Sequence, residues 1–273
     1  MKIVELLHYP VKSLPGTSLA QANVDGLGLA GDRRWMVVDE TGMFLTFRDY
    51  SVMASIAVAI NEAGIVLSHA VFGSVQIRTP GRGTPEASVT VWKDTVLARV
   101  ADDAAHVFLS RIFEKPVRLV YMNDPNARRV DQDFGRSDDH TSFADAFSVL
   151  LTTTASLASL NRQLASPVEM RRFRPNIVVK AQTPWVEDTW RLVRIGNMQL
   201  RVVKSCTRCV MTTRDPDTGN QTDPQEPLRS LAKIHRSPKG KISFGQNLMP
   251  DGAGALHLGD EIEVLESGPS NLI

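Results

Sequence analysis

The sequence predicts a mainly β protein with a few helices, that is, an α+β chain. Most apolar runs are short and bounded by turn-forming residues, which is typical of strands. A few segments instead carry apolar residues at helical spacing, and a polar segment separates two β-rich halves. The chain has 273 residues. Because usual single domains have about 100 to 200 residues, either two domains or one large β-rich domain is expected.

The first half is expected to be mostly β and to end in one helix. That helix covers residues 103–113, where apolar side chains recur at helical spacing, and Asp102 or Asp103 can cap it. Turns are expected at residues 39–42 and 61–64. The strand-like runs of this half are residues 3–9, 34–38, 44–47, 56–60, 65–67, 75–77 and, on both sides of Lys93-Asp94, 89–100.

Residues 122–142 are polar and lack apolar periodicity, so they are expected to form a long loop. We therefore place a domain boundary near this segment, with domains at residues 1–120 and 121–273.

The second half is again expected to be mainly β, with a few covering helices. Thr153 or Thr154 can cap one helix that ends before Pro167, and a short helix begins at Pro227. The apolar side chains of the first of these helices are Leu157, Leu160 and Leu164. The strand-like runs are residues 176–180, 192–195, 199–204 and 261–265.

The charges are balanced and spread along the chain. Lys and Arg total 31 and Asp and Glu total 30, which does not favour nucleic acid or a membrane surface as a partner. The first 25 residues contain no apolar core followed by a cleavage site, and no apolar run approaches the ~20 residues of a membrane span. We expect a cytoplasmic protein.

The segment Cys206-Thr207-Arg208-Cys209 contains both cysteines of the chain. Its spacing fits a redox dithiol, half of a zinc site, one activated thiolate, or two small buried side chains. A redox dithiol usually begins a helix, whereas residues 210–213 resemble a strand, and the six histidines show no ligand spacing that would complete a zinc site. Lys204, Arg208 and Arg214 favour a thiolate, which is a soft metal ligand.

Cationic side chains also occur at the ends of expected strands, where phosphate sites are commonly built. Lys12-Ser13 follows one strand, Arg33 precedes another, and Arg174 precedes Pro175-Asn176 at the start of a third. Each of these charges taken alone is more often a solvated surface group. Asp145 fits a cap, and Asp215 and Asp217 fit an Asx turn leading into Gly219. The four tryptophans, which fit core or cover positions better than substrate platforms, are Trp35, Trp92, Trp185 and Trp190.

Read together, five motifs in this order resemble one family. They are Tyr9-Pro10-Val11-Lys12-Ser13, Gly31-Asp32-Arg33-Arg34-Trp35, Phe173-Arg174-Pro175-Asn176-Ile177-Val178, the cysteine segment with Thr212-Thr213 and Asp215-Pro216-Asp217-Thr218-Gly219, and Phe244-Gly245-Gln246. From about residue 1 to residue 266 the chain resembles MOSC proteins that carry a MOSC N-terminal β-barrel domain, such as the mitochondrial amidoxime reducing component and its bacterial relatives.

The resemblance implies a fold of two β-barrel-like domains with a molybdenum cofactor between them. It implies Cys209 as the metal ligand and Cys206 as a bystander. It implies that Lys12, Ser13 and Arg33 bind the pterin phosphate from the first domain. It implies Asp145 near the metal as a catalytic residue and a candidate proton donor. The other cofactor-binding residues implied are Ala146 and Phe147 through their backbone, Arg174, Asn176, Thr207, Arg208 and Asn247. Phe147 and Asn247 depart from the residues of the eukaryotic members.

The implied activity is the reduction of N-hydroxylated compounds such as amidoximes, hydroxylamines and N-hydroxylated bases. An iron–sulfur domain would need a cluster of four cysteines, which two cannot supply. Electrons are therefore expected from a separate ferredoxin-, flavodoxin- or cytochrome b5-like protein with its reductase. The alternative is a carrier of molybdenum cofactor or sulfur without reductase turnover. Pyridoxal phosphate binding is a further property associated with MOSC domains.

Overall fold

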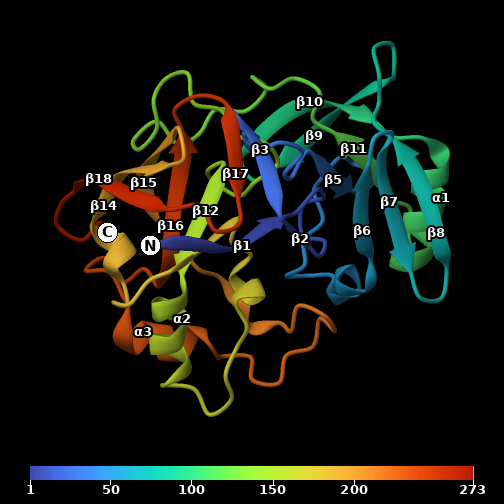
Figure 1. Ribbon diagram of the computed structural model, residues 1–273. Coiled ribbons are helices and arrows are strands. Elements are labelled where there is room, and N and C mark those ends of the chain that lie inside the picture. The colour runs from blue at the N-terminus through green and yellow to red at the C-terminus, as the bar shows by residue number, and fades with distance from the viewer. Residues whose placement is uncertain (273) are drawn as a thin grey trace.

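The computed structural model describes residues 1–272 and confirms a mainly β chain with two curved sheet assemblies (Figure 1). Its α-helices are α1 (Asp103–Phe113), α2 (Thr154–Asn161) and α3 (Leu228–Ile234). The strands before residue 122 are β1 (Lys2–His8), β2 (Thr17–Leu19), β3 (Gln21–Asp25), β4 (Gly28–Leu29), β5 (Trp35–Val38), β6 (Ala57–Asn61), β7 (Gly64–His69), β8 (Gly73–Arg78), β9 (Glu86–Val91), β10 (Asp94–Val100) and β11 (Arg118–Tyr121). Those after it are β12 (Val149–Thr153), β13 (Ile177–Lys180), β14 (Trp190–Ile195), β15 (Met198–Thr207), β16 (Ser243–Pro250), β17 (Gly254–His257) and β18 (Ile262–Ser267).

An eight-stranded sheet forms the C-terminal half, in the order β18-β14-β15-β16-β12-β13-β1-β2. Its first two strands in sequence, β1 and β2, come from the N-terminus and join the edge of β13. Only β12 and β13 within this sheet run parallel, because α2 and a following loop return the chain between them. Inward-facing apolar side chains, among them Leu151, Ile177 and Leu248, form the core beneath the sheet. The boundary near residue 120 stays a prediction.

The N-terminal half holds a four-stranded sheet, β5-β11-β10-β9, and a three-stranded sheet, β6-β7-β8. Helix α1 covers their core at the right of Figure 1 and buries Phe108, Leu109 and Ile112. Its bounds are those expected, because Asp102 caps it by accepting a hydrogen bond from Ala105 N at 3.1 Å. Helix α1 therefore follows its local sequence signals closely.

Three expectations about local structure are wrong. Residues 44–47 do not form a strand, since only Phe44 makes a bridge, to Val38. Residues 210–213 form a short 3-10 helix instead of the expected strand. The expected strand had counted against a redox dithiol, and that objection no longer applies. Leu164 lies beyond the end of α2, which is capped by Thr153 as expected.

Several strands were not expected from the sequence, including β12 and β16 at the centre of the large sheet. Every residue of both strands is buried. A strand covered on both faces loses the polar–apolar alternation by which half-buried strands are recognised. The loop expected at residues 122–142 is confirmed, and it delivers the chain to β12.

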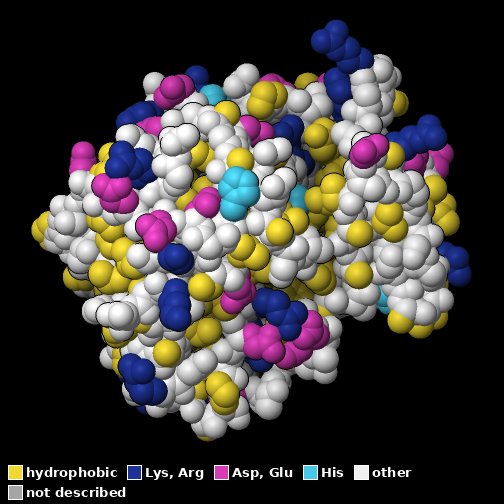
Figure 2. Space-filling model, viewed as in Figure 1, with side chains coloured by type: hydrophobic (Ala, Val, Ile, Leu, Met, Phe, Trp, Pro, Cys, Tyr) yellow, Lys and Arg dark blue, Asp and Glu magenta, His cyan; other side chains and the backbone are white. Residues whose placement is uncertain are grey.

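The surface shows mixed charges. On the face drawn in Figure 2, Lys and Arg lie among Asp and Glu instead of forming one large area of a single sign. In the part of the chain that the structure describes, no helix combines the length and the apolar character needed to cross a membrane.

Candidate functional site

A cavity of about 380 Å³ lies between the two halves of the chain and is lined by every site residue that the sequence predicted. Those residues are Lys12, Ser13, Arg33, Asp145, Ala146, Phe147, Arg174, Asn176, Thr207, Arg208, Cys209 and Asn247. They come from segments far apart in the sequence, so their convergence is a property of the fold. The role of each residue remains a prediction.

The cavity wall contains unusual backbone conformations. Ser13, Arg33, Trp92 and Arg174 have φ values of 69°, 49°, 56° and 54°, in the left-handed region that non-glycine residues avoid. Each such residue costs of order 1 to 3 kcal/mol, and such strain clusters at functional sites. The surrounding structure therefore forces these four side chains into their positions around the cavity.

Lys12 and Asp145 form an ion pair in the lining of the cavity, with 2.5 Å between Lys12 Nζ and Asp145 Oδ1. Lys12 also donates to the carbonyl oxygen of Phe143 at 2.8 Å. Burial lowers the pKa of Lys12 to about 8, although the pairing with Asp145 opposes this shift. Burial alone would raise the pKa of Asp145, but Lys12 and Arg48 outweigh it and hold that pKa well below its usual range. Asp145 is therefore ionised at neutral pH, which favours a counter-ion over a proton donor.

A buried arginine outside the expected set holds the loop that carries Asp145. Arg128 donates to the carbonyl oxygens of Ser142, at 3.0 Å, and of Ala144. Its Nε also donates to Asp94 Oδ2 at 2.6 Å, at the start of β10. The position of Asp145 thus depends on a contact with the N-terminal sheet.

Arg33 and Asn176 connect the two halves at the cavity floor. Arg33 donates to Asp32, to Asn176 Oδ1 at 3.0 Å, and to the carbonyl oxygen of Arg174 at 3.1 Å. Asn176 Oδ1 accepts from Leu150 N at 3.1 Å, and its Nδ2 donates to Leu7 O at 3.2 Å. These side chains are already well paired, so they fix the geometry of the floor.

Arg174 and Arg208, in contrast, each have a buried nitrogen without a hydrogen-bond partner among the described residues, Nη2 and Nε respectively. Their remaining contacts include backbone oxygens: Arg174 donates to Leu14 O at 2.8 Å, and Arg208 to Phe173 O at 2.6 Å. Burial and the neighbouring Arg33 lower the pKa of Arg174 to about 10. Neither guanidinium group pairs with a carboxylate among the described residues, so the positive charge of both would stabilise an anion in the cavity.

The two cysteine sulfurs lie on the same wall, but their surroundings differ. Cys209 directly precedes the 3-10 helix Val210–Thr213, and its Sγ accepts a hydrogen bond from Arg48 Nε at 3.2 Å. Cys206 lies in β15 and accepts from Arg208 Nη1 at 2.9 Å. Both are free and half-buried. A positively charged donor therefore faces each sulfur.

Sequence reasoning missed Arg48 and placed Trp92 among core or cover residues. Trp92 lies in the tight turn between β9 and β10, is 41% exposed, and donates from Nε1 to Asp145 Oδ1 at 3.3 Å. The turn signal at Lys93-Asp94 could have indicated an exposed tryptophan at the hairpin tip. No local signal marks Arg48, because its partners Asp145 and Cys209 are distant in the sequence.

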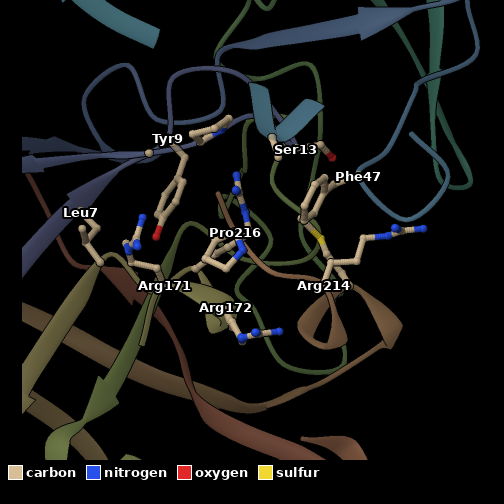
Figure 3. A pocket seen from close by; sticks show the side chains of 13 residues that line it. Leu7, Tyr9, Ser13, Phe47, Arg171, Arg172, Arg214 and Pro216 are labelled. Carbon is tan, nitrogen blue, oxygen red and sulfur yellow. The ribbon is translucent and has the colours of Figure 1, made fainter. Parts of the chain in front are cut away.

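A smaller hollow of about 40 Å³ adjoins the cavity and shares Ser13, Arg174 and Met211 with it. Figure 3 shows Tyr9 pointing into this hollow from one side and Phe47 beside Arg214 on the other. The Tyr9 ring lies between Arg33 and Arg174, 4.4 and 4.3 Å from their guanidinium carbons. The Tyr9 ring thus holds the guanidinium groups of Arg33 and Arg174 by cation–π contacts.

Comparison with known proteins identifies the two halves. Residues 1–116 match the MOSC N-terminal beta barrel domain, and residues 138–263 match the MOSC domain. The mitochondrial amidoxime-reducing component 1 of Mus musculus is 31% identical over 278 residues, which cover 96% of this chain and 82% of that protein. The chain belongs to the MOSC family. The human counterpart of that relative is 30% identical over 279 residues, with the same coverage.

A second kind of relative of this MOSC chain is the molybdenum cofactor sulfurase of Danio rerio. It is 30% identical over 265 residues, which cover 89% of this chain but only 31% of that protein. Together the relatives point to a function related to the molybdenum cofactor and to oxidoreductase chemistry.

Proposed function

We propose that this MOSC protein binds a molybdenum cofactor in the cavity and reduces N-hydroxylated compounds with electrons from a separate protein. The carrying observation is that one cavity combines a soft thiol ligand, Cys209, with two guanidinium groups, Arg174 and Arg208, that have no carboxylate partner among the described residues. A thiolate suits a soft transition metal, and the guanidinium groups suit the phosphate of the pterin.

The charge balance of the cavity supports an anionic ligand of this kind. Six cationic side chains and two carboxylates line it, so the cations are in excess. The cations are Lys12, Arg33, Arg48, Arg174, Lys204 and Arg208, and the carboxylates are Asp131 and Asp145. Carboxylates pair with four of the six cations: Lys12 and Arg48 with Asp145, Arg33 with Asp32, and Lys204 with Asp131. Arg174 and Arg208 are therefore the strongest candidates for the phosphate.

In this proposal Cys209 holds the metal, while Arg174 and Arg208 hold the phosphate with Lys12, Ser13 and Arg33 nearby. When bound, the cofactor supplies the two-electron redox chemistry that removes oxygen from nitrogen as water. Ala146, Phe147 and Asn247 shape the wall beside the metal, and Asn176 and Thr207 fix the ends of their strands.

Lys12 is the protein group best suited to hold a proton at the site. Its pKa of about 8 lies close to neutral pH, and its ammonium group is fixed by Phe143 O and Asp145. Asp145 then acts as the counter-ion that keeps Lys12 protonated, which replaces the proton-donor role expected from the resemblance.

The test is metal and pterin analysis of protein made in a host that synthesises the cofactor, followed by reduction of benzamidoxime with chemically reduced methyl viologen. We expect about one molybdenum and one pterin per chain, and turnover that depends on both. Protein that carries neither cofactor component would refute the proposal.

The likeness to the sulfurase favours a second candidate, a carrier of molybdenum cofactor or sulfur. A carrier needs Cys209 but no electron donor. Molybdenum without benzamidoxime turnover, together with transfer of cofactor to an apo-molybdoenzyme, would favour this alternative.

A further inference from the structure

Arg48 is the one residue of the N-terminal half whose side chain is bonded to the Cys209 sulfur among the described contacts. Its Nε lies 3.2 Å from Cys209 Sγ, and its Nη2 lies 3.6 Å from Asp145 Oδ2. Because Asp145 is more closely paired with Lys12, at 2.5 Å, the charge of Arg48 is only partly neutralised. The guanidinium therefore presents a charged donor directly to the sulfur.

The side chain of Arg48 is held from one side by Trp92. The guanidinium carbon lies 4.6 Å from the centre of the indole ring, a distance typical of a cation–π contact. Trp92 is itself fixed by its hydrogen bond to Asp145 and by its position in the tight β9–β10 turn. Arg48, Trp92 and Asp145 thus form one connected group beside the sulfur.

The backbone of Arg48 is held from the other side by the segment that follows Cys209. Arg214 donates from Nη2 to Arg48 O at 2.8 Å and from Nη1 to Gly219 O at 2.9 Å. Asp215 Oδ1 closes this turn by accepting from Thr218 N at 2.9 Å.

Gly219 packs directly against the N-terminal half. A methyl group on Gly219 would lie 2.5 Å from the Ser51 carbonyl oxygen, so the turn fits closely against the segment that carries Arg48. Residues 215–219 therefore have a structural role. They pack the segment that carries Arg48 against the cavity wall that contains Cys206 and Cys209.

We infer that Arg48 is a positioning residue that tunes the metal through the Cys209 sulfur. This inference rests on the proposed function. A charged hydrogen bond to a ligating sulfur withdraws electron density from it, and hydrogen bonds of this kind tune the reduction potentials of thiolate-bound metals. The donor stabilises the more electron-rich, reduced metal. Arg48 therefore raises the reduction potential of molybdenum without being needed to hold the cofactor.

The experiment compares molybdenum content, the midpoint potential of the metal and its Mo(V) electron paramagnetic resonance spectrum in wild type, Arg48→Gln and Arg48→Lys. We expect full molybdenum occupancy in all three, a midpoint potential shifted to more negative values in Arg48→Gln, and a smaller shift in Arg48→Lys, which keeps the charge. Arg111→Gln is the matched control, because Arg111 also stacks on an aromatic ring, Phe72 at 5.0 Å, but lies on α1. It should leave potential and spectrum unchanged.

An unchanged potential and spectrum in Arg48→Gln, at full occupancy, would overturn the inference alone. Loss of molybdenum from Arg48→Gln would also overturn it, because Arg48 would then be a binding residue. If the wild-type protein itself carried no molybdenum, the proposed function would fail and this inference with it. Failure of benzamidoxime turnover in a molybdenum-loaded wild type would overturn only the reductase proposal.

Discussion

Cys206 and Cys209 are three residues apart on the same cavity wall, and each accepts a hydrogen bond from an arginine, but the two arginines have different origins. Arg208, the donor to Cys206, is two residues away, whereas Arg48, the donor to Cys209, comes from the other half of the chain. The Cys206 contact is local to one strand end. The Cys209 contact exists only when the two halves are packed together. The surroundings of Cys209, the candidate metal ligand, therefore depend on the assembly of the whole cavity.

The largest effect is expected from removing the arginine that we assign to the phosphate. Arg174→Ala should weaken cofactor retention by roughly 10- to 100-fold, because a hydrogen bond to a charged group contributes about 1.5 to 3 kcal/mol. Molybdenum and pterin content after extended dialysis measures this loss. Arg171→Ala is the matched control: it belongs to the neighbouring short helix but pairs with Glu169 and Asp217 and should retain the cofactor. Equal retention in both variants would contradict the assignment of Arg174.

A smaller effect is expected from the Lys12–Asp145 ion pair, and it depends on pH. Lys12 is charged below its pKa of about 8, so turnover should fall as the pH rises through that value. Asp145→Asn removes the main charge that opposes the effect of burial on Lys12, so its pKa should drop further and the fall in turnover should begin at lower pH. Profiles of kcat/KM between about pH 6 and 10 measure the shift, and identical profiles for wild type and Asp145→Asn would contradict the role of the pair.

The last effect is on folding stability, and it concerns the packing of the two halves against each other; we expect it to be the smallest in cofactor content and turnover. Gly219→Ala introduces strain at a φ of +73° and a clash with the Ser51 carbonyl oxygen, and it should destabilise the protein by ~2 to 3 kcal/mol. Gly196→Ala has a similar φ, +56°, but open space around it, and should cost only ~1 kcal/mol. Urea denaturation measures both free energies of unfolding. Equal losses would mean that the Gly219 contact does not hold the halves together.

The same contrast between local and distant contacts explains what the sequence could predict. The bounds of α1 and its Asp102 cap follow from residues that are neighbours in the chain, as does the β9–β10 hairpin. Strands β12 and β16 were missed because burial on both faces removes their alternation. Residues 210–213 were expected as a strand from their β-favouring composition, but the hydrogen bond from Thr212 N to Cys209 O turns the chain there.

The candidate site divides in the same way. Lys12, Arg33, Arg174 and Cys209 were found because family motifs surround them, and the fold brings them to one cavity. Arg48 and Trp92 lie at the site only because the N-terminal half packs against the cavity wall that contains Cys206 and Cys209. No pattern around either residue indicates that contact, so their place at the cavity needed the tertiary structure.

The most direct test of the central claim is the molybdenum content per chain of Cys209→Ser and Cys206→Ser, purified from the same cofactor-competent host. We predict that Cys209→Ser loses both metal and benzamidoxime reduction, because serine replaces the soft thiolate with a hard hydroxyl. Cys206→Ser should keep both. Loss of molybdenum from Cys206→Ser with full occupancy in Cys209→Ser would contradict the assignment of Cys209 as the metal ligand.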